Sequence, residues 1–207
     1  QSYLFAGTRG TGKTTTARIL AKAVNCTCSD PGVDLPCGEC ANCRAITEGR
    51  FLDVVELDAA SNNGVESLRQ ITESVQYPPT VGKYKVYIID EAHMLTDSAE
   101  NAFLKTLEEP PAHVIFILAT TNPEKIKATI KSRCLTLNFR HVSENDLLEG
   151  MKRICQKKDI SIEEDALAVI ARKADGSVRD ALSLLEQCTN AGDELITREL
   201  VLEYTGG

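Results

Sequence analysis

The sequence predicts an α/β fold, in which a parallel β-sheet with helices on both faces is followed by a smaller, all-helical domain. Up to about residue 141, short apolar and β-branched runs alternate with segments of helical periodicity. After Val142, helix-start signals recur without any further run of that kind. We therefore expect an α/β domain over residues 1–141 and a helical domain over residues 142–207.

Short apolar runs mark the expected strands. Residues 86–89 and 114–118 are continuously apolar, which is typical of strands covered on both faces of a sheet. The full set of expected strands is 3–6, 54–57, 86–89, 114–118 and 135–139. Since so little of the first strand precedes the glycine-rich segment that follows it, we expect the natural chain to begin before Gln1.

Periodicity and capping residues indicate the helices. Residues 13–25 place apolar side chains on one face at i, i+3, i+4 and i+7 spacing. Further helices of the α/β domain are expected at 64–76 and 98–108. In the helical domain, the expected first residues or N-caps are Ser143, Ser161, Ser177 and Thr197. Residues 26–43 are rich in cysteine, proline and glycine, so we expect no regular element there.

Charge and hydropathy exclude several classes of protein. The net charge of the 207 residues is −7, so a protein that grips DNA with its whole surface is excluded, and any nucleic-acid contact needs a local patch or partner proteins. No apolar run approaches the roughly 20 residues that cross a bilayer, so no membrane partner is expected. With no secretory signal pattern either, we expect a cytoplasmic location.

Residues 7–14 read GTRGTGKT and match the phosphate-binding pattern G-x-x-x-x-G-K-[ST] at every fixed position. Glycines let successive backbone N–H groups surround phosphates, and the next helix points its positive end at the same anion. Lys13 should reach the β- and γ-phosphates, and the Thr14 hydroxyl should ligate magnesium. A chance match is disfavoured because the segment follows a strand and begins a helix. The predicted nucleotide-binding residues here are Gly7, Thr8, Arg9, Gly10, Thr11, Gly12, Lys13, Thr14 and Thr15.

Two carboxylates follow the apolar strand at 86–89. Asp90 is expected to hold the magnesium ion, and Glu91 to polarise the attacking water, as phosphoryl transfer requires. Acidic pairs at strand ends are common, but together with the phosphate-binding loop the pair becomes specific. Because Glu91 already fills the role of base, His93 is interpreted as a structural or relay residue.

Five of the eight cysteines lie between positions 26 and 43, which favours a metal site over disulfides. Cys37, Cys40 and Cys43 have the spacing of zinc ligands, and either Cys26 or Cys28 would supply the fourth thiolate of a closed, structural site. Free thiols and an iron–sulfur cluster are the alternatives. A zinc ribbon that binds nucleic acid is less favoured, because the segment is not basic.

Motifs along the whole chain resemble those of the bacterial DNA polymerase III gamma/tau family, the ATPases of the sliding-clamp loader. They are the phosphate-binding loop, the cysteine insertion, ELDAAS at 56–61, IDEAHML at 89–95, LKTLEEPP at 104–111, LATTNP at 118–123, SRC at 132–134 and GSVRD at 176–180. The resemblance implies an AAA+ core with a structural zinc insertion at 26–43 and a helical lid. Because Asn25-Cys26 matches the family's Asn-Cys at the end of the loop helix, Cys26 is chosen as the fourth ligand, and Cys28 is its competitor by distance to Cys37.

The resemblance also implies residue roles that spacing alone does not give. Thr121 matches the polar residue that senses the γ-phosphate, and Arg179 matches the second sensor, which contacts the nucleotide from the lid. Arg133 matches the arginine finger that acts on the nucleotide of a neighbouring subunit. The implied cofactors are ATP, Mg²⁺ and Zn²⁺. The implied catalytic set is Lys13, Glu91, Thr121, Arg133 and Arg179.

The expected function is therefore ATP binding and hydrolysis within the DNA polymerase III holoenzyme, driving the loading of the sliding clamp. The chain would not itself polymerise DNA. The implied partners are other loader subunits, further copies of the chain, the clamp and primed DNA. A non-hydrolysing structural subunit, a helicase or other P-loop nucleic-acid motor, and a zinc-dependent nucleic-acid-binding module are the alternatives. A non-hydrolysing subunit is disfavoured by the presence of Lys13, Thr14, Asp90 and Glu91. A helicase is disfavoured because the segment after residue 142 is short and helical.

Overall fold

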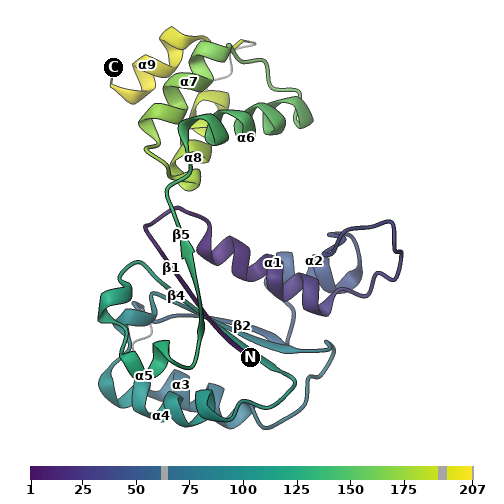
Figure 1. The fold of residues 1–207 in the computed structure, drawn as a ribbon. Helices are drawn as coiled ribbons and strands as arrows, with labels where there is room; N and C mark the ends of the chain where they lie inside the picture. Colours follow the sequence, from purple (N-terminus) through teal and green to yellow (C-terminus); the bar gives the residue numbers. More distant parts are fainter. Residues whose placement is uncertain (62–64, 191–194, 207) are drawn as a thin grey trace. The chain divides into compact units, whose positions relative to one another are not determined.

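The computed structural model describes residues 1–61, 65–190 and 195–206 (Figure 1). The chain divides into two compact units. We call Gln1–Gly7 with Lys13–Asn138 the core unit, and Thr8–Gly12 with Phe139–Gly207 the helical unit. Each unit is described separately below.

The core unit is built on a sheet of five strands in the order β2-β3-β4-β1-β5. The pairs β2–β3, β3–β4 and β1–β4 are parallel. The most buried strand is β4, all of whose residues are buried, as expected for an apolar run covered on both faces. The strands are β1 (Ser2–Gly7), β2 (Val54–Asp58), β3 (Lys85–Asp90), β4 (Val114–Thr120) and β5 (Leu135–Phe139).

The register of the strands brings polar residues together at one edge of the sheet. Ala6 of β1 pairs with Thr120 of β4, and Ile89 of β3 pairs with Leu118 of β4. Gly7 follows Ala6, Thr121 follows Thr120, and Asp90 follows Ile89 in the chain, so all three lie near the same edge. In parallel sheets the carboxyl ends of the strands lie at the same edge, where ligands bind.

Helices cover both faces of this sheet: α1 and α2 lie on one face, and α3, α4 and α5 on the other (Figure 1). Phe103 of α4 packs edge-on against Phe116 of β4 with ring centroids 4.9 Å apart, a contact worth about 0.5–1.5 kcal/mol beyond the buried area. The helices are α1 (Lys13–Asn25), α2 (Ala41–Thr47), α3 (Val65–Ser74), α4 (Asp97–Glu108) and α5 (Ala128–Lys131), with short 3-10 turns at Ala92–Met94 and Pro123–Lys125.

The described part of the helical unit contains α6 (Glu144–Lys157), α7 (Glu164–Lys173), α8 (Val178–Thr189) and α9 (Arg198–Thr205). Their apolar faces form one core, which includes Met151, Ile170 and Val201. The predicted N-caps Ser143, Ser177 and Thr197 are confirmed. Each hydroxyl accepts a hydrogen bond from the backbone N–H three residues on, as a capping residue does.

Two local predictions were wrong. Ser161 does not cap α7, which begins at Glu164; its carbonyl instead accepts from the N–H of Ile196 at 2.9 Å, next to a parallel bridge between Ile162 and Ile196. Residues 26–43 are not wholly irregular, because α2 begins at Ala41. The Cys40 thiol occupies the position of an N-cap acceptor for this helix and accepts from Cys43 N. Of the expected helix 64–76, Gly64 lies outside the described residues.

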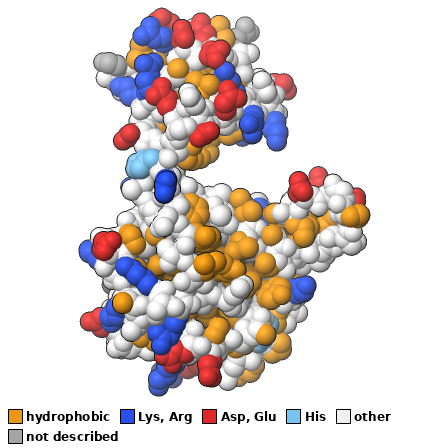
Figure 2. All heavy atoms as spheres, viewed as in Figure 1, with side chains coloured by type: hydrophobic (Ala, Val, Ile, Leu, Met, Phe, Trp, Pro, Cys, Tyr) orange, Lys and Arg blue, Asp and Glu red, His pale blue; other side chains and the backbone are white. Residues whose placement is uncertain are grey.

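Surface charge differs between the two units on the face shown in Figure 2. Acidic and basic side chains alternate over the helical unit, whereas hydrophobic side chains gather over the core unit. The visible face therefore offers no continuous basic surface among the residues drawn in colour. None of the helices in the described ranges combines the length and the apolarity needed to cross a bilayer.

Candidate functional site

The glycine-rich segment 7–14 connects the end of β1 to the start of α1. Gly10 and Gly12 have φ angles of 78° and 92°, in the left-handed region that glycine adopts without strain. Within the helical unit, a Cβ on Gly10 would lie 2.0 Å from the Ser177 hydroxyl oxygen, so position 10 also lacks room for a side chain. Glycine at position 10 therefore permits both the left-handed turn and the close approach of Ser177.

Lys13 and Thr14 are the first two residues of α1, and their side chains contact Gly7 and Asp90. The Lys13 side chain is 7% exposed, and its Nζ donates a 2.8 Å hydrogen bond to the carbonyl of Gly7. The Thr14 Oγ1 donates to Oδ2 of Asp90 at 2.8 Å. The loop lysine and both predicted magnesium ligands are therefore connected to elements that fix their positions.

Glu91 lies directly beyond β3 in a left-handed conformation, with a φ angle of 49°. Such a conformation costs a non-glycine residue about 1–3 kcal/mol and is concentrated at functional sites. The Glu91 backbone N–H donates to Oδ1 of Asp90 at 2.9 Å, and its carboxylate accepts a 3.1 Å hydrogen bond from Thr121 Oγ1. The structure thus brings together four predicted residues, Thr14, Asp90, Glu91 and Thr121.

Thr120 belongs to the same cluster, although no motif in the sequence indicated it. It is the last residue of β4 and is fully buried, and its hydroxyl lies 2.9 Å from Nδ1 of His93. A polar residue at the end of an otherwise apolar run was the available signal. The sequence gives no indication that Thr120 faces His93, which is 27 residues earlier.

Arg133 lies two residues beyond the end of α5 in the core unit. Its guanidinium donates to Glu108 Oε1 and to the Thr129 carbonyl, both at 2.6 Å. These partners lie outside the loop and the Asp90–Glu91 pair. The contacts of Arg133 within this chain therefore do not test its predicted role on the nucleotide of a neighbouring subunit.

Arg179 lies in the first turn of α8, within the helical unit that includes Thr8–Gly12. The Gly10 carbonyl accepts from Val178 N at 2.9 Å and from Arg179 N at 3.4 Å. The positive end of α8 therefore lies against the loop segment, which places Arg179 beside predicted nucleotide-binding residues.

The remaining loop residues make local contacts. Thr11 Oγ1 donates to the carbonyl of Thr8 at 2.8 Å, while Arg9 and Thr15 are exposed. Thr8 Oγ1 lies 3.2 Å from Nε2 of His141, a residue not identified from the sequence. Since His141 follows β5 in the chain by two residues and meets the loop only in the folded structure, no local motif revealed it.

Four of the clustered cysteines converge. The sulfur atoms of Cys26, Cys37, Cys40 and Cys43 all lie within 4.8 Å of one another, and Cys28 is not part of this group. The Cys26 Sγ is 3.5 Å from that of Cys37 and 3.9 Å from that of Cys40. A tetrahedral zinc ion with Zn–S bonds of about 2.3 Å separates its sulfur atoms by about 3.8 Å, and the Cys26–Cys37 and Cys26–Cys40 separations lie close to this value.

Backbone N–H groups favour the thiolate form at Cys37 and Cys40, whereas burial raises the pKa of Cys43 to about 12. Cys40 N lies 3.3 Å from the Cys37 sulfur, and Cys43 N lies 3.4 Å from the Cys40 sulfur. Hydrogen bonds from the backbone of Cys40 and Glu39 lower the pKa of Cys37. Burial opposes the same effect at Cys40, but hydrogen bonds from Thr27 and Cys43 lower its pKa to about 5. Thiolates are the form that binds metal.

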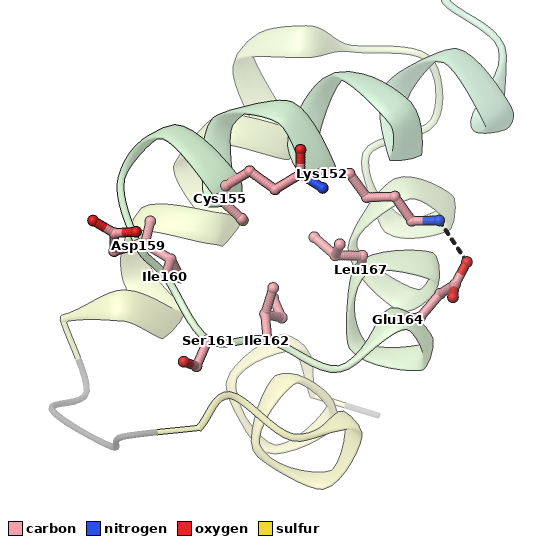
Figure 3. Close-up of a pocket in the computed structure, with 9 residues that line it drawn as sticks. Lys152, Cys155, Asp159, Ile160, Ser161, Ile162, Glu164 and Leu167 are labelled. Carbon is pink, nitrogen blue, oxygen red and sulfur yellow. Dashed lines mark hydrogen bonds and ion pairs between the residues drawn. The ribbon is translucent and has the colours of Figure 1, made fainter.

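A separate concavity lies within the helical unit, between α6, the segment that follows it, and α7 (Figure 3). Lys152 at its rim forms an ion pair with Glu164, 2.6 Å between Nζ and Oε1. None of the predicted site residues is among those that line it. It therefore adds nothing to the site at the carboxyl edge of the sheet.

The glycine-rich loop connects β1 to α1, the Asp90–Glu91 pair lies at the end of β3, and β4 lies between β1 and β3 in the sheet. This arrangement defines a P-loop nucleotide-binding protein of the AAA+ class. Comparisons with known proteins place the chain within that class. A family model described as "DNA polymerase III, delta subunit" matches residues 1–143, and one described as "DNA polymerase III clamp loader subunit, ATPase lid domain" matches residues 147–194. The chain belongs to the clamp-loader subunit family of DNA polymerase III.

The known proteins with similar sequences include tau and gamma subunits of DNA polymerase III. This confirms the resemblance that the motifs indicated. The chain is 51% identical to the DNA polymerase III subunit tau of Bacillus subtilis (strain 168), over 99% of the chain and 36% of that protein. It is 48% identical to subunit tau of Escherichia coli (strain K12), over 99% of the chain and 32% of that protein. The chain thus spans about a third of the length of these relatives.

Solved structures share the fold. The Thermotoga maritima RuvB Holliday junction branch migration motor superposes with a TM-score of 0.68 at 21% identity, over 98% of this chain and 60% of that one. A DNA polymerase III gamma subunit-related protein from the same organism gives a TM-score of 0.56 at 21% identity, over 98% of this chain and 65% of that one. At this identity the likeness supports the AAA+ fold alone.

Proposed function

We propose that this chain is the ATP-binding and ATP-hydrolysing part of a clamp-loader subunit in a bacterial DNA polymerase III holoenzyme. Residues 1–141 would form its nucleotide-binding core and residues 142–207 its lid. The observation that carries the proposal is the cluster at the carboxyl edge of the sheet, where Thr14 contacts Asp90 at 2.8 Å and Thr121 contacts Glu91 at 3.1 Å.

The residues present fit the phosphates of ATP and a magnesium ion. Thr14 and Asp90 supply the hydroxyl and carboxylate oxygens that magnesium prefers, and bound magnesium would neutralise phosphate charge. Lys13 and the backbone N–H groups of 7–14 would hold the phosphates. Glu91 would orient and polarise the attacking water, because its backbone N–H donates to Asp90 and its carboxylate is held by the hydroxyl of Thr121.

Three further residues, Thr121, Arg179 and Arg133, would act on the nucleotide from other parts of the chain or from an adjacent subunit. Thr121 would contact the γ-phosphate, and Arg179 would contact the nucleotide from the lid. Arg133 would act on the nucleotide of an adjacent subunit, where a finger in trans is worth about 10³–10⁵ in rate. This division predicts a chain that hydrolyses ATP slowly by itself and rapidly in the assembly.

The proposed partners are other loader subunits, further copies of this chain, the sliding clamp and primed DNA, in the cytoplasm. ATP must bind one state of the assembly better than the other if it is to switch between holding and releasing the clamp. The four converging thiols would hold a structural zinc ion, which would tie the segment 26–43 to the end of α1.

A P-loop nucleic-acid motor is the second candidate, because the RuvB structures share the fold. The sequence similarity to tau and gamma subunits over 99% of the chain favours the clamp loader. A non-hydrolysing loader subunit is less favoured, because Lys13, Thr14, Asp90 and Glu91 are all present and connected in the site.

The test is ATP turnover by the full-length subunit assembled with the rest of its loader, with clamp and primed DNA. Glu91→Gln should bind ATP normally and lose turnover by at least 10², because the base is neutralised. Glu109→Gln, an exposed glutamate after α4, is the matched control and should behave like wild type. Equal turnover by wild type and Glu91→Gln would contradict the proposed hydrolysis.

A further inference from the structure

The side chains that follow β3 meet two hydroxyls at the end of β4. Thr121 Oγ1 donates to Glu91 Oε2 at 3.1 Å, and Thr120 Oγ1 lies 2.9 Å from His93 Nδ1. The other ring nitrogen of His93, Nε2, lies 3.5 Å from the same Oε2 of Glu91. The carboxylate of Glu91, the predicted base, is therefore contacted by Thr121 directly and by Thr120 through His93.

The contacts of Thr120 and Glu91 with the two ring nitrogens together favour one position for the proton of His93. The Asn122 backbone N–H donates to Thr120 Oγ1 at 3.0 Å, so this oxygen already acts as an acceptor. Its own hydrogen is then available to donate to Nδ1 of His93. A neutral imidazole has one donor and one acceptor nitrogen, so an accepting Nδ1 places the ring hydrogen on Nε2.

The opposite tautomer would be unfavourable at this position. It would direct the Nε2 lone pair toward Glu91 Oε2, and an ionised carboxylate is only an acceptor. Thr120 is fully buried and the His93 side chain is 10% exposed, which leaves little access for water to compensate. The Nε2–H tautomer satisfies every one of these atoms.

We propose that His93 is a positioning residue for Glu91: Thr120 fixes the imidazole so that its Nε2–H holds the Glu91 carboxylate through Oε2. This inference rests on the proposed function, in which Glu91 is the base and Thr121 contacts the γ-phosphate. When the Thr121 hydroxyl turns to the phosphate, His93 still provides Oε2 with a donor. The 3.5 Å separation is long, as active-site contacts often are before they shorten in the transition state.

A packing role for His93 is the competing explanation, since it lies in the 3-10 turn Ala92–Met94 beside the buried Ala92. A packing role depends on ring volume, whereas a positioning role depends on a donor at the place of Nε2 and on the hydroxyl of Thr120. Substitutions that separate these two requirements therefore distinguish the explanations.

The experiment measures kcat, KM and ATP affinity for the full-length subunit in its assembled loader, with clamp and primed DNA. His93→Ala should lower kcat about ten- to hundredfold, the worth of one hydrogen bond to a charged group, and leave ATP affinity unchanged. His93→Gln should recover most of kcat, because its amide N–H can take the place of Nε2–H. His113→Gln is the matched control, since that ring contacts the carbonyls of Val75 and Tyr77 and should leave turnover at the wild-type level.

Substitutions of Thr120 provide an independent test of the same inference. Thr120→Val removes the hydroxyl at nearly constant volume and should lower kcat in wild type but add little in the His93→Ala background, because both act through one contact. Thr120→Ser keeps the hydroxyl and should retain turnover. This arm also decides the question if His93→Ala fails to assemble.

Two outcomes would overturn the inference. Wild-type kcat in His93→Ala and Thr120→Val would show that neither holds the base. Equal losses in His93→Ala and His93→Gln, with lowered thermal stability and an additive effect of Thr120→Val, would assign His93 to packing. The Glu91→Gln control separates these from failure of the proposed function: if it leaves turnover intact, the function is wrong, whatever the His93 variants do.

Discussion

The hydroxyl of Thr14, in the first turn of α1, donates a 2.8 Å hydrogen bond to Oδ2 of Asp90, the last residue of β3. The two residues are 76 positions apart in the chain, and each is carried by a regular element of the core unit. Rigid elements hold ligand geometry more accurately than loops do. The proposed magnesium ligands are therefore positioned by the packing of α1 against the sheet.

Asp90→Asn tests this site directly. Asparagine keeps one oxygen near Thr14 but removes the negative charge, so the gain in ATP affinity caused by magnesium should fall by about tenfold or more, the effect of about 1.4 kcal/mol. Titration of a fluorescent ATP analogue with magnesium and with EDTA measures this gain. Asp165→Asn, an exposed change on α7, should leave the gain intact. An unchanged magnesium dependence in Asp90→Asn would rule out its role as a ligand.

Lys13→Ala should weaken ATP binding by about 10- to 100-fold, because a charge-assisted hydrogen bond to phosphate is worth about 1.5–3 kcal/mol. The matched control is Lys22→Ala, in the last turn of the same helix, whose Nζ contacts the exposed Thr47 hydroxyl at 3.3 Å. Equilibrium binding of an ATP analogue to each variant gives the comparison. Similar affinities for the two variants would mean that the loop lysine does not hold phosphate.

Arg133→Ala should leave ATP affinity unchanged and lower turnover of the assembled loader on the order of 10³. The reason is that Arg133 contacts Glu108 and Thr129 within its own chain, and its proposed role is on the nucleotide of an adjacent subunit. Steady-state ATPase assays with clamp and primed DNA provide the measurement. Arg69→Ala, which removes an exposed partner of Glu73, controls for loss of a surface charge. Full turnover in Arg133→Ala would exclude the in-trans role.

The sequence predicted those features that depend on neighbouring residues. The loop, the Asp90–Glu91 pair and three of the helix caps follow from local patterns, because glycine φ angles, helix starts and buried strands are determined within a few residues. The contacts of Thr120 with His93 and of Thr8 with His141 arise from strand register and chain packing, which no local motif encodes. Ser161 failed as a cap for the same reason, since its segment pairs with Ile196 instead.

The four converging cysteines are those that the sequence analysis favoured, with Cys28 as the competitor of Cys26. Spacing indicated three ligands, but the choice between Cys26 and Cys28 depended on the path of the segment between Cys28 and Cys37, which contains no regular element. In the structure the Cys26 sulfur joins the group, because Cys26 immediately follows the end of α1. That helix end is held in turn by Asn42 Nδ2, which donates to the Asn25 carbonyl at 2.8 Å.

The zinc proposal predicts one zinc ion per chain, measured by elemental analysis of protein purified without added metal. Cys40→Ser should lose the metal and lower the melting temperature, because a closed four-thiolate site contributes directly to folding. Cys28→Ser is the matched control, as this thiol lies outside the converging group, and it should retain both zinc and stability. Loss of zinc in Cys28→Ser with retention in Cys26→Ser would reverse the ligand assignment.

The buried carboxylate of Asp53 predicts a pH-dependent stability. It is 2% exposed and accepts from the backbone N–H groups of Thr80, Val81 and Gly82 at 2.7, 2.6 and 2.6 Å. Burial raises the pKa of Asp53, but these hydrogen bonds outweigh burial, so the pKa in the folded protein lies below its ordinary value. The stabilisation is therefore fully present above the unfolded pKa of about 3.9 and is lost as pH falls through the lower, folded pKa.

Asp53→Asn should accordingly lower the free energy of unfolding by about 1–3 kcal/mol at neutral pH, because an amide N–H₂ must face at least one of the three donors. The penalty should shrink below about pH 4, where the wild-type carboxylate also begins to lose its advantage. Urea unfolding of the 207-residue chain across this range measures both quantities. Asp30→Asn, in an exposed loop where the carboxylate accepts a hydrogen bond from Gly32 N, should change stability by less than about 0.5 kcal/mol. A penalty for Asp53→Asn that does not vary with pH would show that shape, not charge, is what the three N–H groups require.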